Sequence, residues 1–203
     1  MRTAAIPMIA ALAAGCGDNG RGGGGGHDDG GTEPPGARLV YTDPDHGALR
    51  LIHDPAGTSA GAVVLAFVVG DQPLSGYAAG FNLPLDARRV KLAAFTPGTG
   101  LDPGGPPLAA QAVIPAQGPL AGMLVTAQSQ KASGAGAVTG DTALPPHTVL
   151  YTLRLELADG ATAGVVLDGS AAGFALPSGG LRNRLGTAVV QAGEVGIGKL
   201  EIR

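Results

Sequence analysis

The chain is poor in several residue types on which common functions depend. Its 203 residues include a single cysteine and no tryptophan, and only 3% are aromatic and 14% charged. A lone cysteine cannot form an internal disulfide. A formal net charge of −3 provides no basic surface for nucleic acid, so no nucleic-acid partner is expected.

The first residues have the order of a secretory signal: one positive charge at Arg2, an apolar run, then small residues. The run is well short of the ~20 residues that a membrane-spanning helix needs. It ends in Leu12-Ala13-Ala14-Gly15-Cys16, which resembles the lipobox of bacterial lipoproteins, although the preferred leucine stands four places before the cysteine instead of three. An ordinary signal peptide with an incidental cysteine is the alternative.

The lipoprotein resemblance implies that residues 1–15 are a cleaved signal peptide and that lipid, including palmitate, is attached at Cys16. The protein would then be anchored in a membrane of the bacterial cell envelope, on the periplasmic or the exposed side. One acyl chain anchors only marginally, so stable attachment requires several chains on this residue.

The segment after the cysteine, residues 16–36, is rich in glycine and includes the run Gly22–Gly26. It has too little apolar surface to offset the entropy of ordering it, so we expect a flexible tether. His27-Asp28-Asp29 within it can bind a metal transiently, but the pattern is more typical of a solvated spacer. Residues 37–203 form the third predicted unit, a β domain.

This unit consists of short β-like runs separated by turn residues. Ala62–Val69 is continuously apolar, which predicts a central buried strand. Gly76–Asp86 alternates, with Tyr77, Ala79, Phe81, Leu83 and Leu85 on one face. The other runs with strand character are Arg38–Thr42, Ala48–His53, Arg89–Phe95, Leu108–Ile114, Leu120–Gln128, Ala172–Leu176, Ala188–Gln191 and Ile197–Ile202.

The clearest alternation lies in Thr148–Leu157, where Val149, Tyr151, Leu153, Leu155 and Leu157 are predicted to point inward. Asp159-Gly160 supplies a turn, after which Thr162–Leu167 is predicted to be the hairpin partner. With roughly ten to twelve short strands and no amphipathic helix, the sequence predicts an all-β fold, an antiparallel β-sandwich.

Two segments, Gly76–Leu101 and Gly122–Arg203, resemble a cohesin domain. The matching residues are Phe81-Asn82-Leu83-Pro84-Leu85-Asp86, Val90-Lys91-Leu92, Thr96-Pro97-Gly98, Leu150–Leu157 after Gly140-Asp141, and Gly193–Ile202. The resemblance implies a nine-stranded, cohesin-like jelly roll used for protein docking or carbohydrate-related scaffolding. Pro84 departs from the pattern and predicts an edge strand or a bulge, because proline lacks a ladder donor.

Candidate chemical motifs are incomplete. Gly57-Thr58-Ser59-Ala60-Gly61 matches a nucleophile elbow by letter, but it precedes a strand and no helix follows, so a loop is predicted. Asp43-Pro44-Asp45-His46-Gly47 lacks the remaining ligands of a calcium loop and predicts a turn. The four histidines lack zinc spacing: His27, His46, His53 and His147. Gly134, Gly136 and Gly140 are not followed by the Lys-Ser/Thr of a phosphate loop.

No catalytic, metal-binding or cofactor-binding residue is therefore expected, and the protein is predicted not to be an enzyme. The leading hypothesis is a lipid-anchored envelope protein that displays a non-catalytic binding or scaffolding module with a protein partner. The alternative is a carbohydrate-binding module for a polysaccharide. Such a module usually binds sugar rings on a platform of exposed aromatic side chains. Too few are available here, because most of the aromatic residues occupy inward-facing positions: Tyr41, Tyr77, Tyr151, Phe67, Phe81, Phe95 and Phe174. A third hypothesis, a hydrolase with a cryptic site, requires carboxylates or a Ser–His pair to converge.

Overall fold

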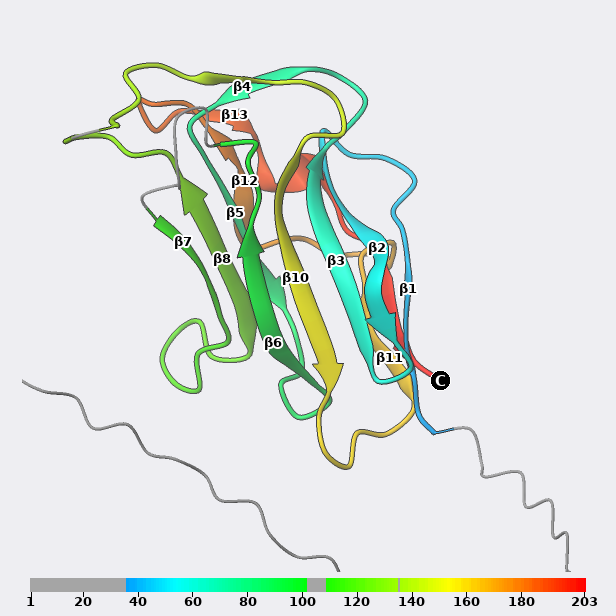
Figure 1. Ribbon diagram of the computed structural model, residues 1–203. Coiled ribbons are helices and arrows are strands. Elements are labelled where there is room, and N and C mark those ends of the chain that lie inside the picture. The colour runs from blue at the N-terminus through cyan, green and yellow to red at the C-terminus, as the bar shows by residue number, and fades with distance from the viewer. Residues whose placement is uncertain (1–35, 102–108, 135) are drawn as a thin grey trace, which may run out of the picture. The chain divides into compact units, whose positions relative to one another are not determined.

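In the part of the chain that the structure describes, short strands follow one another and are interrupted by a 3-10 helix, η1 (Figure 1). The computed structural model describes residues 36–101, 109–134 and 136–203, so the predicted signal peptide, Cys16, His27 and residues 16–35 of the tether lie outside the described residues. The elements, in chain order, are β1 (Leu39–Thr42), β2 (Leu49–Ser59), β3 (Ala62–Val69), β4 (Leu74–Gly76), β5 (Ala78–Pro84), β6 (Val90–Pro97), β7 (Ala109–Val113), β8 (Met123–Ser129), β9 (Thr142–Leu144), β10 (Val149–Leu157), β11 (Gly164–Asp168), β12 (Ser178–Arg182), β13 (Ala188–Val190), η1 (Ala192–Glu194), β14 (Val195–Gly196) and β15 (Lys199–Ile202).

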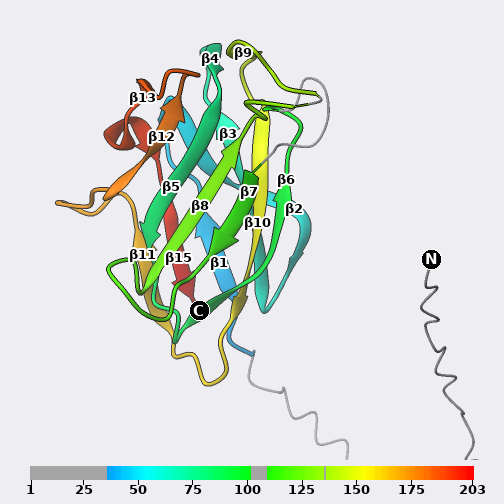
Figure 2. The same ribbon diagram turned by 90° about the vertical axis from the view of Figure 1, so that its left-hand side faces the viewer.

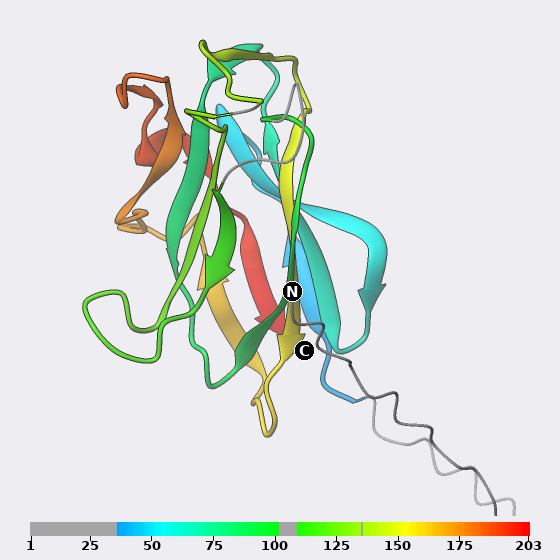
Figure 3. The ribbon, with the colours of Figure 1, turned by 60° about the vertical axis from the view of Figure 1, so that its left-hand side comes forward.

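Two five-stranded sheets face each other, which confirms the predicted β-sandwich (Figures 1 and 2). Sheet I has the strand order β14-β2-β3-β10-β6, and sheet II has the order β13-β12-β5-β8-β7. A three-stranded sheet, β1-β15-β11, lies beside them at one end, and β4 pairs with β9 (Figure 3). The pairs are antiparallel except β14 with β2.

The core forms where the alternating apolar residues of the two sheets meet. In sheet I, Phe67 on β3 is in register with Tyr151 on β10, and in sheet II Phe81 on β5 points inward. The Phe67 and Phe81 rings meet edge to face with centroids 5.0 Å apart, and Tyr151 lies 5.1 Å from Phe67. Phe95 on β6 packs on Tyr151 from the other side. Aromatic contacts therefore join the sheets at the centre of the sandwich.

Several predictions from periodicity are confirmed. Ala62–Val69 is β3, a central strand between β2 and β10, and all but one of its residues are buried, in agreement with its continuous apolar sequence. The predicted inward face of Gly76–Asp86 is buried: Tyr77, Ala79, Phe81, Leu83 and Leu85.

The predicted hairpin between Thr148–Leu157 and Thr162–Leu167 is wrong. Both edges of β10 are occupied, by β3 and β6, so β11 pairs instead with β15. The inward orientation of Val149 is also wrong: a register shift between Val149 and Tyr151 leaves Val149 40% exposed and buries Leu150 in its place.

Two further predictions fail for local reasons. Pro84 is on neither an edge strand nor a bulge, because β5 lies between β12 and β8. The proline is tolerated since β12 begins at Ser178, opposite Asn82, and does not extend to Pro84. Residues 172–176 are a turn and an irregular stretch instead of a strand, although Leu176 still reaches the core.

Candidate functional site

The two faces of the sandwich differ sharply in charge. The five strands of sheet II contain a single charged side chain, Arg182. Sheet I, by contrast, carries charges on three strands: Arg50, Asp54, Lys91, Arg154 and Glu156. Depletion of charge is typical of the central part of a protein–protein interface. The outer face of sheet II is therefore the candidate functional site.

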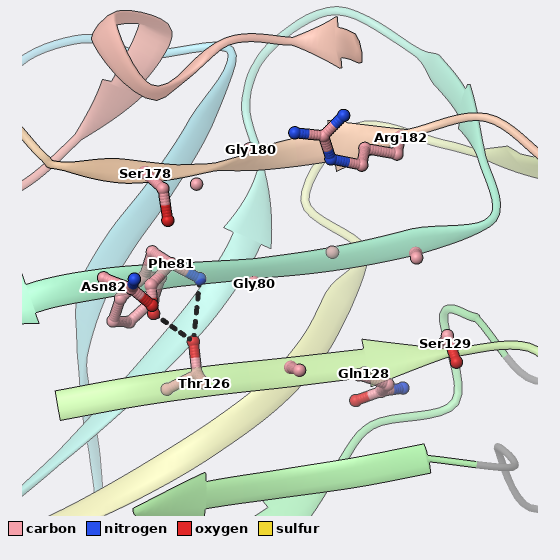
Figure 4. Close-up of a pocket in the computed structure, with 13 residues that line it drawn as sticks. Gly80, Phe81, Asn82, Thr126, Gln128, Ser129, Ser178, Gly180 and Arg182 are labelled. Carbon is pink, nitrogen blue, oxygen red and sulfur yellow. Dashed lines mark hydrogen bonds between the residues drawn. The ribbon is translucent and has the colours of Figure 1, made fainter. Parts of the chain in front are cut away.

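A shallow groove of about 240 Å³ runs over β12, β5 and β8 (Figure 4). Its floor is made by Gly180 and Gly80, which are in register, and by Ala127 beside them. At one end of the groove, Ser178 and Asn82 form a cross-strand pair. At the other end, Arg182 is paired with Ala78. Pockets for drug-sized molecules span ~300–1,000 Å³. The groove thus fits a side chain or a short stretch of a partner better than a whole small molecule.

Glycine forms the floor because the neighbouring strand leaves no space for a side chain. A Cβ atom at Gly80 would overlap the carbonyl oxygen of Thr126, and one at Gly180 would overlap that of Val190. Gly180 also has a φ of 112°, a conformation that side chains disfavour. At these two positions the floor is consequently backbone without side chains, with Gly80 half-buried and Gly180 buried.

The floor is supported from inside by Thr126 on β8. Its hydroxyl oxygen accepts a hydrogen bond from the Phe81 N–H (3.0 Å), and the hydroxyl donates to the Phe81 carbonyl (3.2 Å). Because that single proton is used, the Tyr151 hydroxyl, 2.7 Å away, donates to Thr126. Burial raises the pKa of Tyr151 far above its usual range. The groove therefore rests on a neutral, hydrogen-bonded core.

Most of the exposed large apolar side chains belong to the same sheet and its loops. The described residues include six large hydrophobic side chains with substantial exposure. Four belong to sheet II or its connections: Val113, Leu120, Leu185 and Val189. The other two are Val149 in sheet I and Val165 on β11. The exposed large apolar side chains are thus more numerous on sheet II and its loops than elsewhere in the described residues, although they occupy separate positions.

The candidate elbow motif, Gly57–Gly61, lies at the end of β2 and in the turn to β3, with no helix after it. The Thr58 hydroxyl donates to the Asp54 carbonyl (2.9 Å), while His53 Nε2 lies 3.1 Å from the hydroxyl oxygen of Thr58. The hydroxyl proton is thus already directed to the backbone, away from His53, so this pair does not form a nucleophile and base.

The other predicted motifs do not assemble into a site. Among the described residues, no group of three or more His, Cys, Asp or Glu side chains could hold a metal ion. The Asp43–Gly47 segment connects β1 to β2. His147 lies 3.9 Å from the exposed Asp71. Tyr41, Tyr77, Tyr151, Phe67 and Phe81 are buried. Within the described ranges there is also no helix of the length and hydropathy that crossing a membrane requires.

Sequence reasoning missed β12, the strand that forms one side of the groove. β12 contains Ser178-Gly179-Gly180, residues that indicate a turn when read alone. The sequence does contain a signal for the other part of the face, because residues 103–130, which include β7 and β8, contain no charged side chain. Such a charge-free stretch in a near-neutral domain marks the uncharged face.

No protein-family model matches the chain, and no curated protein matches it. Among solved structures, the chain is similar to the solution structure of CaCohA2 from Clostridium acetobutylicum, with 13% sequence identity and a TM-score of 0.42. The match covers 80% of this chain and 89% of that one. At this level of similarity, no site residue or partner transfers to this chain.

Proposed function

We propose that the chain is a non-catalytic docking module that binds a protein partner through the outer face of sheet II. The observation that supports this proposal is the low charge of that face. Arg182 is the single charged side chain on the strands of sheet II, and it lines a groove whose floor contains two glycines. The role agrees with the docking function that the sequence resemblance to cohesins implies. The partner surface is expected to be mainly apolar, with a carboxylate opposite Arg182.

The experiment fills the groove without disturbing the core. In Ala127→Arg, a long charged side chain projects from β8 into the groove, and we expect a partner retained by the full chain in detergent extracts of the envelope to be lost. Ala94→Arg is the matched control, since Ala94 is an exposed alanine on β6 in sheet I. Equal recovery by all three proteins at several salt concentrations would reject docking through sheet II.

We further propose that the module is anchored in the bacterial cell envelope by lipid on Cys16, with residues 16–36 as the tether. The support is the lipobox-like sequence and the absence of any second cysteine. Cys16→Ser is expected to abolish incorporation of labelled palmitate and to release the protein from the membrane fraction. Unchanged membrane fractionation would show that Cys16 does not anchor the chain.

The carbohydrate-binding alternative makes a different prediction. An exposed aromatic platform would be needed to stack on sugar rings, whereas Phe67, Phe81 and Tyr151 pack on one another inside the sandwich. We therefore expect no retardation of the domain in affinity electrophoresis on a panel of polysaccharides. Retardation that is lost in Ala127→Arg but kept in Ala94→Arg would favour a sugar ligand in the groove.

A further inference from the structure

The turn between β12 and β13 carries the most exposed large apolar side chain of the described residues. Leu185 is 87% exposed at its tip, and Val189, on β13, is 39% exposed. Figure 2 shows this hairpin at the end of sheet II to which β12 runs. Arg182, the last residue of β12, also lines the groove. The apolar tip is thus continuous with the proposed docking face.

Hydrogen bonds hold the turn in place. Asn183 Oδ1 accepts from the backbone N–H groups of Leu185 (3.0 Å) and Thr187 (2.9 Å). The Asn183 N–H donates to the Thr187 carbonyl, and Arg182 Nη1 donates to the Gly186 carbonyl (2.8 Å). These contacts fix the backbone of the turn and keep Leu185 pointing away from the core. A side chain on a preorganised turn requires less ordering of the backbone on binding than one in a flexible loop.

Among the described residues, two positive side chains beside this tip, Arg182 and Arg184, outnumber the one nearby carboxylate, Asp141. Arg182 and Arg184 are both exposed, and in the described part of the chain neither forms an ion pair. The nearby carboxylate of Asp141 accepts from the backbone N–H of Arg184 instead. An acidic binding partner would supply the missing counter-charges.

We propose that Leu185 is the anchor of the docking face and inserts into an apolar pocket on an acidic protein partner, whose carboxylates pair with Arg182 and Arg184. This inference rests on the proposed docking function and adds the chemistry of the partner to it. Hydrophobic anchors in desolvated pockets carry a large share of binding energy, while a surrounding charged rim contributes mainly to association rate and selectivity. A membrane surface and a second copy of this chain are the competing occupants.

Site-specific photo-cross-linking identifies the occupant. A benzophenone amino acid replaces Leu185 in the full chain, and Val165 is the control position, because it is 47% exposed on β11, outside sheet II. We expect illumination of cells that express the chain to yield a protein adduct from position 185 and none of the same mass from position 165. The cross-linked peptide is expected to contain Asp or Glu. Adducts only to lipid or to this chain itself would overturn the inference.

The purified partner then provides the quantitative test. Leu185→Ala is expected to raise the Kd about tenfold, in line with an anchor residue worth more than 1 kcal/mol. Arg184→Ala is expected to raise the Kd about threefold and to weaken its salt dependence. Val165→Ala should leave the Kd unchanged, and Leu185→Ala should leave the free energy of unfolding within about 0.5 kcal/mol of the parent, as for other surface changes.

The results separate the two proposals. If Ala127→Arg abolishes binding but Leu185→Ala changes the Kd by less than twofold, the partner docks on sheet II without this anchor. The proposal for Leu185 is then wrong, while the proposed docking function stands. If neither substitution affects binding, both the proposed docking through sheet II and the proposed role of Leu185 are wrong.

Discussion

The hydroxyl of Tyr151 in sheet I lies 2.7 Å from the hydroxyl of Thr126 in sheet II. This contact is a polar link between two sheets that otherwise meet at the centre mainly through apolar and aromatic side chains. Thr126 also binds both the N–H and the carbonyl of Phe81, on the strand that forms the middle of the groove. The pair therefore couples the position of the candidate docking face to the core.

The first prediction concerns this pair. Thr126→Val removes the hydrogen bonds to the Phe81 backbone and leaves the Tyr151 hydroxyl buried without a partner, so we expect a loss of about 3 kcal/mol in the free energy of unfolding. Tyr151→Phe leaves the bonds from Thr126 to Phe81 intact and should cost only about 1 kcal/mol. Urea denaturation measures both.

Thr96→Val is the control, since Thr96 is exposed in sheet I and its substitution should stay within about 0.5 kcal/mol of the parent. Equal losses for Thr126→Val and Thr96→Val would show that the buried link contributes nothing.

The second prediction concerns alkaline pH. Burial raises the pKa of both Tyr41 and Tyr151 far above the usual value near 10. Above pH ~10 the unfolded chain loses these protons while the folded protein keeps them, so stability falls by about 1.4 kcal/mol per pH unit for each tyrosine. Below that pH the contribution is constant.

The check is the free energy of unfolding between pH 8 and pH 11.5, together with tyrosinate absorbance. A Tyr41→Phe/Tyr151→Phe protein should show a shallower decline than the parent. Parallel curves for the two proteins would mean that these hydroxyls ionise without hindrance in the folded state.

The third prediction concerns Arg89, which connects the β5–β6 turn to the start of β11. Its guanidinium donates to the carbonyls of Thr162 (3.0 Å), Gly164 (2.9 Å) and Val165 (2.6 Å). Arg89→Ala is expected to cost about 2 kcal/mol and to accelerate amide exchange in residues 158–168. Lysine cannot reproduce the planar fork, so Arg89→Lys should recover less than half of the loss.

Arg88→Ala serves as the comparison, because the neighbouring Arg88 side chain is 95% exposed. Unfolding free energies that agree for Arg88→Ala and Arg89→Ala, with unaltered exchange in residues 158–168, would contradict this role.

The fold class could be predicted because alternation and apolar runs report which faces of a strand are buried. Residues 62–69 and 76–86 were predicted correctly on that basis. Pairing was harder, since alternation does not specify the neighbour along either edge. The predicted hairpin after β10 failed because β3 and β6 already occupy both of its edges, a fact that depends on the whole topology.

The groove could be predicted only in part. The charge-free residues 103–130 are visible in the sequence, but the alignment of Gly80 with Gly180 is set by the register of β5 with β12. β12 has low intrinsic strand propensity at Gly179-Gly180 and forms a strand because it pairs with β5 and β13. Tertiary pairing determines that strand, so local sequence patterns could not reveal it.

The last prediction concerns Gly80 itself. A Cβ atom there would overlap the Thr126 carbonyl oxygen, which belongs to backbone and cannot rotate away. Gly80→Ala must therefore push β5 and β8 apart, and we expect a loss of more than about 2 kcal/mol in the free energy of unfolding. Gly61→Ala is the control, because nothing lies within 4 Å of a Cβ at Gly61, and its effect should lie between neutral and about 1 kcal/mol of stabilisation. Calorimetric unfolding of the two proteins measures the difference, and equal midpoints would mean that the β5–β8 spacing does not require glycine at position 80.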